Sequence, residues 1–588
     1  MKRDRVFSVL LVLLLVIGAA NIAYLYAAPP ATPANTLDGV GFNVPYVISQ
    51  TGYSIGANEV ISILRAADFT SVDSPEYFLN AVNKTDLLAY PQQDYDYLIY
   101  TDGTNYYAKN GTTGLVDYSG TNATAIISSA YNSLTVGRTW KETIVLKGNF
   151  TIDTEINPLS YSKTIIQGKI SVIAGEVINI INILNAHDVE VIGGELDGNQ
   201  ANTPYGADMT HQTGIWVWDS YNCIVDTVYV HDCWADGIAV RGATSSRDNL
   251  IQNCRVDNVG SAAFEALEPS IRTTFINCNG TTVNYPTGFA TMAGYEIRSD
   301  YNKFINCYAV DCATTGFLLM HTAAHNELLH CSSVNSTGNG FYSIETVSYN
   351  LLQDCQSIDS GGLGFKFTAT FQFNTLDNCV ASGSTLAGFQ FYIIDHYNLI
   401  TNCKTINGQV RGWEIANSLR LQFINCQAYD NSQNGDGVSE GWEITASTDC
   451  QFINCRSIST NGALRQDRGF REEGACDRNQ WISCVAVGNK NGQIVLLGAN
   501  NIIHYNTGYV AENSGTATLL NGQTTIAVTH GLSYTPTAKD ITITFTELPT
   551  NPTTGWMIGT FTSTQFTFTA NDPGASNLDF SWHAIRTP

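Results

Sequence analysis

The sequence has little charge and no cluster of basic residues. Asp, Glu, Lys and Arg make up only 14% of its 588 residues, and the formal net charge is −23. Proteins that bind nucleic acid need basic surface to neutralise phosphates, so we expect no nucleic-acid partner. No CxxC pair has a His or Cys at the spacing of a zinc site, and we expect neither a metal nor another cofactor.

The chain starts with an apolar segment. Residues 1–5 (MKRDR) precede an apolar run from Val6 to Ala28, and a basic flank before an apolar core is typical of an export signal. The run is long enough to span a bilayer, and Pro29–Pro30 makes an unfavourable cleavage site, so we favour a signal anchor over a cleaved signal peptide. In either case we expect an extracellular protein, secreted or anchored to the cell membrane through residues 6–28.

The centre of the chain lacks helical periodicity and repeats one pattern instead. The repeat is marked by a cysteine about every 24 residues, at positions 254, 278, 307, 331, 355, 379, 403, 426, 455 and 484. A fixed period of this length is the signature of a solenoid. Each unit holds three short runs that alternate in polarity, separated by Gly, Asn, Asp and Ser. Three strands in each repeat predict one coil of a parallel β-helix.

Two details of the repeat support this assignment. The longer units carry their extra residues before a strand that begins with Gly and an aromatic residue, and solenoids accept insertions in such loops. An Asn precedes many of the cysteines and fits a tight bend, because Asn tolerates the left-handed conformation and can hydrogen-bond from coil to coil. These Asn residues are at 253, 277, 306, 378, 402, 425 and 454.

Residues 143–503 resemble the right-handed parallel β-helix proteins of the pectate lyase-like superfamily. GGELDGN (193–199) is similar to a Gly-Asp-Gly turn of that superfamily, for which the resemblance implies a structural role. The Asn-Thr-Asp, Asp-Asp and Gly-His-Gly motifs of polygalacturonases are missing from the solenoid. Its outward carboxylates are single, so the calcium of pectate lyases is not implied. An alginate-type lyase or epimerase stays open, since Arg298, His321 and Tyr342 fall on successive coils.

The remaining segments frame the solenoid. We expect an all-β protein divided into a signal peptide or anchor (1–28), a linker (29–40), a small β-rich region (41–120), a capping-helix region (121–142), the parallel β-helix (143–508) and a C-terminal β-sandwich (511–588). The sandwich is expected from its Thr-rich alternating strands. It resembles the C-terminal modules of phage tail fibres and of H-type lectins, which implies binding or oligomerisation, with a homotrimer as one possibility.

Most of the fifteen cysteines repeat at one coil position, as inward-facing side chains do. We therefore favour a ladder of buried thiols over a disulfide framework. Cys233, Cys312, Cys450 and Cys476 lie off this ladder and are better candidates for disulfides.

Candidate site residues follow from the strand that begins with Gly and an aromatic residue. If the aromatic side chain points inward, strand alternation places its neighbours outside. Trp216 and Trp218 then form a platform for sugar rings, with packing under loop 198–213 an equal alternative. Arg241 and Tyr342 are expected to contact the same substrate.

Glu265 and Glu296 fall on adjacent coils, with backbones about 4.8 Å apart. Such a pair suits glycosidic cleavage, and like charges raise the pKa of one carboxyl. Arg298 and His321 would orient the substrate. The alternative for the pair is surface ion pairing.

Other polar residues near these strands are explained by surface or turn positions. Glu414 and Glu443 have no evident basic partner in the sequence and are expected to be surface residues. Next to His231 and Asp232, Asp236 is explained as a turn residue before a Gly-Ile strand. Loops 198–213 and 279–293 are long enough to wall the site.

Two functions are consistent with these features. The first is an extracellular protein that binds polysaccharide and possibly cleaves it as a hydrolase or lyase. The second is a non-catalytic adhesin or tail-fibre-like protein in which the solenoid is a spacer and the sandwich recognises the partner and forms trimers.

Overall fold

The computed structural model describes residues 94–204, 212–244, 246–283, 293–393, 397–498, 500–510, 512–546, 555–570 and 576–586. The expected membrane segment, the linker and residues 41–93 lie outside these ranges, as do residues 205–211 and 284–292 of the two long loops. Among the described residues, no helix is long and apolar enough to cross a membrane.

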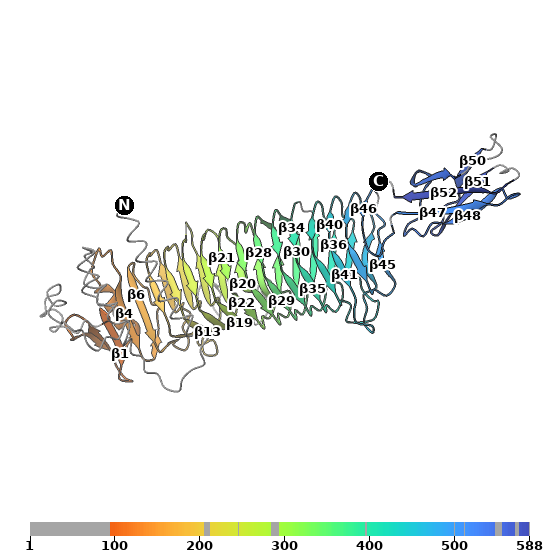
Figure 1. The fold of residues 1–588 in the computed structure, drawn as a ribbon. Coiled ribbons are helices and arrows are strands. Elements are labelled where there is room, and N and C mark those ends of the chain that lie inside the picture. The colour runs from red at the N-terminus through yellow and green to blue at the C-terminus, as the bar shows by residue number, and fades with distance from the viewer. Residues whose placement is uncertain are drawn as a thin grey trace, which may run out of the picture. The chain divides into compact units, whose positions relative to one another are not determined.

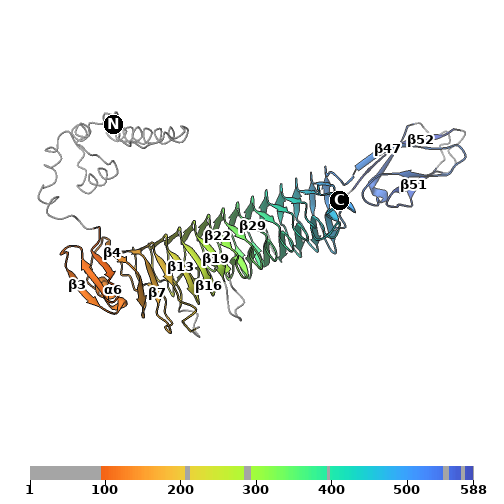
Figure 2. The same cartoon turned by 90° about the horizontal axis from the view of Figure 1, so that it is seen from below.

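Three parallel sheets, each built from one short strand per coil, wind into the solenoid seen along its length in Figures 1 and 2. One coil consists of β15 (Leu250–Gln252), β16 (Arg255–Val259) and β17 (Phe264–Ala266). Each pairs in parallel with its equivalent in the next coil: β18 (Thr274–Ile276), β19 (Asn279–Val283) and β20 (Ala293–Ile297). The predicted all-β parallel β-helix is confirmed.

Sheet 1 contains the strands that precede the Asn-Cys bend. Its parallel strands are β4 (Glu142–Lys147), β6 (Ser162–Gln167), β9 (Glu190–Ile192), β12 (Ile224–Asp226), β15, β18, β21 (Lys303–Ile305), β24 (Glu327–Leu329), β28 (Leu351–Gln353), β31 (Thr375–Asp377), β34 (Leu399–Thr401), β37 (Gln422–Ile424), β40 (Gln451–Ile453), β43 (Gln480–Ile482) and β46 (Ile502–His504).

Sheet 2 contains the strands that follow the bend. They are β5 (Phe150–Ile152), β7 (Lys169–Val172), β10 (Glu195–Asp197), β13 (Tyr229–Cys233), β16, β19, β22 (Tyr308–Val310), β25 (Ser332–Val334), β29 (Gln356–Ile358), β32 (Val380–Ser382), β35 (Lys404–Ile406), β38 (Gln427–Tyr429), β41 (Arg456–Ile458) and β44 (Val485–Val487).

Sheet 3 contains most of the Gly-aromatic strands. They are β8 (Ile181–Leu184), β11 (Ile215–Trp218), β14 (Ile238–Arg241), β17, β20, β23 (Thr315–Leu319), β26 (Phe341–Ser343), β30 (Phe365–Gln372), β33 (Phe389–Ile393), β36 (Trp413–Ala416), β39 (Trp442–Thr445), β42 (Arg468–Glu473) and β45 (Gly492–Val495), with β27 (Thr346–Ser348) beside β30.

The aromatic residues that follow glycine in the strands of sheet 3 point into the solenoid, as predicted. The Phe341 ring stacks between Phe317 and Phe365 at centroid distances of 4.7 and 4.6 Å, and all three side chains are fully buried. The preceding glycine is needed for space: a Cβ at Gly340 would lie 2.6 Å from the carbonyl oxygen of Gly364 on the next coil. Aromatic stacking and close coil contact therefore explain the Gly-aromatic motif together.

The Asn-Cys bend also has the predicted geometry. All seven Asn residues named above have positive φ, and the Asn277 side chain donates to Asn253 Oδ1 at 3.1 Å. A second Asn ladder, which sequence inspection did not identify, lies inside the turn between sheets 3 and 1. There Asn350 Nδ2 donates to Asn374 Oδ1 at 3.1 Å, and the backbone N–H of Asn326 donates to Asn350 Oδ1 at 2.8 Å.

All fifteen cysteines are free and buried, which confirms the thiol ladder. The expectation of disulfides at Cys233, Cys312, Cys450 and Cys476 is wrong. These side chains also pack into the core, although they lie off the main ladder. Burial raises the pKa of Cys312 to about 12, so this thiol stays protonated in its apolar surroundings.

The start of the described chain is antiparallel and helical. Strands β1 (Tyr97–Thr101), β2 (Tyr106–Asn110) and β3 (Val116–Gly120) form two hairpins, and β1 also pairs in parallel with β4. Helix α6 (Ala123–Asn132) begins at Asn122, whose side chain accepts from Ala125 N at 2.9 Å. Its Ile126, Ile127 and Tyr131 belong to the same apolar core as the solenoid.

The C-terminal residues form two small antiparallel sheets around a separate core. One holds β47 (Glu512–Leu519), β52 (Leu578–Ile585) and β49 (Ile541–Phe545), with β52 central. The other holds β48 (Thr525–Thr529), β51 (Gln565–Ala570) and β50 (Trp556–Gly559), with β51 central. A 3₁₀ turn, η1 (Ala538–Asp540), precedes β49. Phe566, Phe568, Phe580 and Trp582 fill the core.

Candidate functional site

An open cleft lies at the turn that leads from sheet 2 to sheet 3. It has a volume of about 470 Å³ and is lined by Asp197, Asn199, Gln200, Ala201, Asp232, Trp234 and Asn258. This volume is within the range of about 300–1,000 Å³ that is usual for small-molecule sites. The lining comes from β10, β13, β16 and the turns after β10 and β13, so three consecutive coils build one cavity. Trp234 is anchored there by its indole N–H, which donates to Thr203 O at 2.9 Å.

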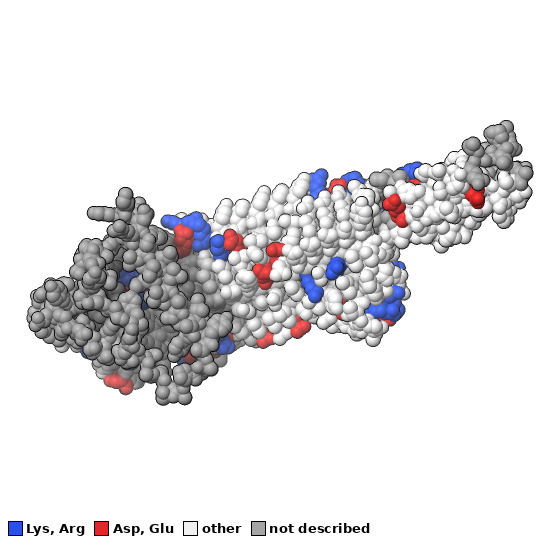
Figure 3. All heavy atoms as spheres, in the orientation of Figure 1, with Lys and Arg blue, Asp and Glu red and all other residues white. Residues whose placement is uncertain are grey.

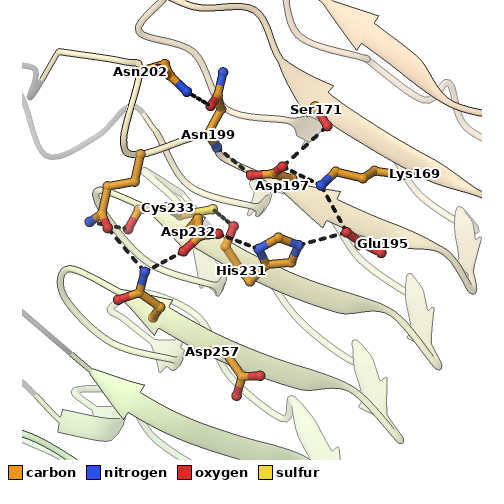
Figure 4. Close-up of polar contacts among 12 residues, drawn as sticks. Lys169, Ser171, Glu195, Asp197, Asn199, Asn202, His231, Asp232, Cys233 and Asp257 are labelled. Carbon is orange, nitrogen blue, oxygen red and sulfur yellow. Dashed lines mark hydrogen bonds and ion pairs between the residues drawn. The ribbon is translucent and has the colours of Figure 1, made fainter.

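A network of charged side chains continues from the cleft across sheet 2 (Figure 4). Lys169 Nζ lies 2.6 Å from Asp197 Oδ2 and 3.1 Å from Glu195 Oε1. The His231 ring lies between Glu195 Oε1, at 3.0 Å, and Asp232 Oδ2, at 2.8 Å. Parallel register brings these residues together, because Asp197 pairs with His231, and Glu195 pairs with Lys169. The network therefore fixes the carboxylate of Asp197 and that of Asp232 on the wall of the cleft.

Hydrogen bonds favour the ionised forms of Asp197 and Glu195. Burial alone would raise the pKa of Asp197, but hydrogen bonds from Lys169 and from the backbone N–H of Asn199 outweigh it and lower the pKa. Hydrogen bonds from His231 and Lys169 lower the pKa of Glu195. The cleft therefore presents fixed negative charge, backbone groups and side-chain amides to a ligand.

Asp197, His231 and Asp232 each place one potential metal-ligand atom in a small region. These three atoms lie within 4.8 Å of one another, close enough to share a cation. Each already has a protein partner: Lys169 pairs with Asp197, while Glu195 and Asp232 face the two nitrogens of His231. An ammonium group at Asp197 disfavours a second positive charge at the same oxygen. This donor set does not imply a metal centre.

The predicted carboxylate pair lies on the outer face of sheet 3. Glu265 and Glu296 are direct register partners on β17 and β20, as predicted. Both are almost fully buried, with 2% and 1% of their surface exposed, and so is Asp236 at 1%. Arg241 contacts Asp236 at 2.6 Å and also contacts Glu265, while Arg298 contacts Glu296. The cluster therefore holds three almost fully buried carboxylates and two guanidinium groups.

Burial, together with the excess of one carboxylate over the guanidinium groups of the cluster, raises the pKa values of Glu265 and Glu296. Burial raises the pKa of Glu265, and the neighbouring charge of Asp236 raises it further against the opposing effect of Arg241. Burial also raises the pKa of Glu296, although Arg298 opposes it. Three anions cannot be balanced by two cations in a site without solvent. The cluster is therefore built to hold one proton near neutral pH.

The cleft and the cluster lie on either side of one short turn. Asp232 and Trp234 line the cleft, and Asp236, two residues beyond Trp234, begins the cluster. Asp236 Oδ1 accepts from Ala262 N at 3.0 Å on the next coil, which fixes the end of the turn. The cleft and the cluster are therefore adjacent in the chain, joined by residues 232–236.

The predicted sugar platform is wrong in that Trp216 is not exposed. Trp216 and Trp218 stack at 5.4 Å on the outer side of sheet 3, but Trp216 is buried and the guanidinium of Arg241 lies 4.8 Å above its ring. The more exposed Trp218 is only half-buried. The face of Trp216 is therefore occupied by Arg241 and is not an open surface for a sugar ring.

His321 and Tyr342 have partners outside the carboxylate cluster. His321 Nδ1 lies 3.3 Å from Glu345 Oε2, and both side chains are exposed. Tyr342 lies under Lys366, with the ammonium 4.6 Å from the ring centroid. The structure thus joins Arg241 and Arg298 to the predicted carboxylates but places His321 and Tyr342 in separate pairs.

The expectation that Glu414 and Glu443 lack basic partners is also wrong. Arg411 contacts Glu443 and lies 3.8 Å from Glu414, and Arg471 lies 2.5 Å from the buried Glu440. Burial raises the pKa of Glu443. These residues form an ion-pair network on the later coils of sheet 3. On the face shown in Figure 3, by contrast, charged side chains are scattered and mostly in small groups.

Sequence inspection missed the cleft. Asp197 and Asn199 belong to the GGELDGN turn, for which the family resemblance implies a structural role, and the sequence alone does not connect His231 and Asp232 with that turn. Trp234 stands in a turn outside the repeated strands. The available signal was an HDCW segment that places a His, an Asp and a Trp at one corner of the solenoid.

Comparisons with known proteins support the fold. Residues 172–392 match the family model described as "Right handed beta helix region". A search among curated proteins found no match. The tailspike protein of E. coli bacteriophage HK620 in complex with a pentasaccharide is similar in structure, with a TM-score of 0.52 and 8% identity over 79% of this chain and 90% of that chain. A mutant of that tailspike gives a TM-score of 0.51, 9% identity and the same coverage.

A mannuronan C-5 epimerase A-module of Azotobacter vinelandii is 12% identical, with a TM-score of 0.37, over 65% of this chain and 96% of that chain. At these identities the structural likenesses show the fold alone. The solenoid is a right-handed parallel β-helix of the kind also found in a phage tailspike.

Proposed function

We propose that this protein binds a polysaccharide outside the cell and that the cleft beside Trp234 holds part of the sugar chain. The observation that carries the proposal is the cleft itself: an indole, three side-chain amides and two carboxylates face one cavity of about 470 Å³. Aromatic surface packs against the C–H faces of a sugar, and amides and carboxylates hydrogen-bond its hydroxyls. A similar solenoid in the HK620 tailspike was solved with a pentasaccharide, which supports this use of the fold.

The negative charge of the cleft favours a polysaccharide without acidic groups. Among the described residues, the lining of the cleft includes Asp197 and Asp232 but no Lys or Arg. Lys169 lies behind Asp197 and is already paired with it. A uronate would therefore meet like charge, so the proposal favours a neutral or N-acetylated polysaccharide over a polyuronate.

Binding of the full chain to a panel of neutral and anionic polysaccharides tests the proposal. Trp234→Ala and Asp232→Asn should each weaken binding at least tenfold, because they remove the apolar wall and a fixed acceptor. Trp140→Ala is the matched control, since Trp140 is a 57% exposed Trp that does not line the cleft. Binding that both cleft variants retain at the parent level refutes this site.

Cleavage is a separate part of the proposal, and Glu265 and Glu296 remain its predicted acid and nucleophile or base. Their register spacing of about 4.8 Å is near the separation of about 5–5.5 Å used by retaining glycosidases. Their burial and their ion pairs with Arg241 and Arg298 leave them without substrate access in this structure. Release of reducing ends or unsaturated products that stops in Glu265→Gln and Glu296→Gln supports catalysis; release that continues in both variants contradicts it.

A second candidate function is a non-catalytic adhesin whose C-terminal residues form a β-sandwich that recognises a glycan and joins three copies. Two three-stranded sheets that share one core favour a separate module in this region. Light scattering of the full chain tests the trimer. A mass near three times the 63.9 kDa of one chain supports it, and the mass of a single chain refutes it. Export, proposed from residues 1–28, is tested by cell fractionation.

A further inference from the structure

The cleft beside Trp234 offers a ligand chiefly oxygen atoms, because the protein already uses the nitrogen atoms of its lining. Each of the four side-chain nitrogens among the described lining residues donates to an oxygen of the protein. These bonds run from Trp234 Nε1 to Thr203 O (2.9 Å), from Asn199 Nδ2 to Val172 O (2.9 Å), from Gln200 Nε2 to Cys233 O (3.4 Å) and from Asn258 Nδ2 to Asp232 Oδ1. A ligand that supplies hydrogen-bond donors therefore matches this lining better than one that supplies acceptors.

Asp232 is the carboxylate that a ligand can reach most readily. Its side chain is 40% exposed, and it accepts from Asn258 at one oxygen and faces His231 at the other. A carboxylate has about four lone-pair positions, so Asp232 can accept further hydrogen bonds. Asp197 is only 16% exposed and already has the ammonium group of Lys169 at 2.6 Å. We therefore expect the donor group of a ligand to lie at Asp232.

The side chains around Asp232 carry more negative than positive charge. The register partner of His231 on β16 is a further carboxylate, so that the group drawn in Figure 4 contains four: Glu195, Asp197, Asp232 and Asp257. Lys169 and Arg255 each lie 2.6 Å from one of them. Even when His231 is protonated, these four carboxylates exceed the three cations by one. One uncompensated charge at close range changes the affinity for a charged ligand by about tenfold.

An ammonium group fits this combination better than the other common groups of a sugar. It has three N–H donors, no acceptor and a positive charge. A hydroxyl group is neutral, the acetamide of an N-acetylated sugar pairs its one donor with a carbonyl acceptor, and a carboxylate only accepts. The indole of Trp234, which also lines the cleft, adds attraction for a cation. The same atoms therefore favour a sugar with a free amine over its acetylated form.

We propose that the cleft selects polysaccharides that contain amino sugars with a free amine, and that the ammonium group binds at Asp232. This inference rests on the proposed function, because it names the sugar that the same cleft prefers. The proposed function ranks acidic sugars below neutral ones, and the inference ranks cationic sugars above both.

Isothermal titration calorimetry of the full chain tests the inference, at low salt and at pH 6, where aliphatic amines are protonated. The ligands are hexamers of glucosamine and of galactosamine, each compared with its fully N-acetylated form. We expect at least one amine form to bind about tenfold more tightly than its acetylated form. Sodium chloride at about 0.5 M should reduce this ratio, because salt screens partly exposed charges.

Asp232→Asn is the deciding variant, because it removes the charge and keeps the size of the side chain. Asn also tolerates the positive φ of this position, so the turn is preserved. We expect the affinities of the amine and acetylated forms to differ by less than about threefold in this variant. Asp311→Asn is the matched control and should keep the parent ratio. Asp311 is exposed, has a positive φ at the equivalent position of a later coil and does not line the cleft.

The outcomes distinguish this inference from the proposed function. A preference for the amine form in the parent and in Asp311→Asn, but not in Asp232→Asn, supports the inference. Equal affinity of the two forms, or a preference that Asp232→Asn retains, overturns it and leaves the proposed function standing. Failure of all four ligands to bind also overturns it, and the polysaccharide panel with Trp234→Ala then decides the proposed function alone. Displacement of the amine form by an equal concentration of oligolysine shows that the cleft accepts any ammonium group, which overturns the assignment to a sugar.

Discussion

Removing one guanidinium from the buried cluster of Asp236, Arg241, Glu265, Glu296 and Arg298 should destabilise the protein strongly. Arg241 pairs with both Asp236 and Glu265, so Arg241→Met leaves three buried carboxylates facing one cation. Breaking a buried ion pair from one side costs about 3–5 kcal/mol, because the remaining charge stays buried without a partner. We expect a loss of this size at pH 7, measured by guanidinium unfolding.

The pH dependence of folding stability tests whether the buried carboxylates are responsible for this loss. Burial and Asp236 raise the pKa of Glu265 to about 8 from an ordinary value of 4.5. A carboxyl with a raised folded-state pKa stabilises the protein fully below its unfolded pKa, and this contribution is lost as pH rises through the folded pKa. Stability should therefore fall between about pH 4.5 and pH 8, by up to about 1.4 kcal/mol for each unit of pKa shift.

Glu265→Gln removes the excess carboxylate and should flatten this decline in the thermal midpoint between pH 5 and pH 9. Glu414→Gln is the matched control, because Glu414 is more exposed and its distance to Arg411 is as long as 3.8 Å. This variant should show the same decline of the thermal midpoint with pH as the parent. The reasoning is refuted if Glu265→Gln follows the same slope as the parent, or if Arg241→Met unfolds at the parent's guanidinium concentration.

Three further predictions concern the interior of the solenoid. Phe341→Ala removes the middle ring of a buried stack and should cost about 3–5 kcal/mol in guanidinium unfolding; a cost below 1 kcal/mol contradicts the stacked core. Asn350→Ala leaves the buried backbone N–H of Asn326 without its acceptor and removes the side-chain donor to Asn374 Oδ1, and should cost about 1–3 kcal/mol; full stability would mean that the inner Asn ladder contributes nothing. A thiol reagent should react with none of the fifteen buried cysteines of the native protein and with all of them after denaturation, whereas rapid reaction of the native protein would show that the ladder is open.

The repeat made the solenoid predictable. Each coil position recurs, so Gly and an aromatic residue in one place, or Asn before Cys in another, report the same local environment many times. The inward direction of Phe317 and Phe341 and the positive φ of Asn253 followed from that repetition. The register of Glu265 with Glu296 followed in the same way.

Burial on the outer face was not predictable from alternation. Alternation tells on which side of a sheet a side chain lies, but not whether other residues cover it. Trp216, Glu265 and Glu296 do leave sheet 3 outward, yet all three are buried. The same limit explains the pair of Arg411 and Glu443, since the partner of a charged residue in a solenoid can lie on the next coil, far away in the sequence.

The cleft escaped prediction because the turn that carries it does not repeat in sequence. Asp232 and Trp234 occur in a turn with no counterpart of the same sequence on other coils. Their proximity to Asp197 and Asn199 depends on the parallel pairing of β10 with β13. The disulfide expectation failed for a related reason: Cys233 and Cys312 lie off the repeated ladder, but the turns that carry them also point inward.

A crystal structure of the full chain with the oligosaccharide that binds best tests the central proposal most directly. We expect the sugar to contact the indole of Trp234 and the side chains of Asp232 and Asn199, in the cleft at the corner between sheets 2 and 3. A sugar found elsewhere on the solenoid, with this cleft empty at saturating concentration, would contradict the proposal.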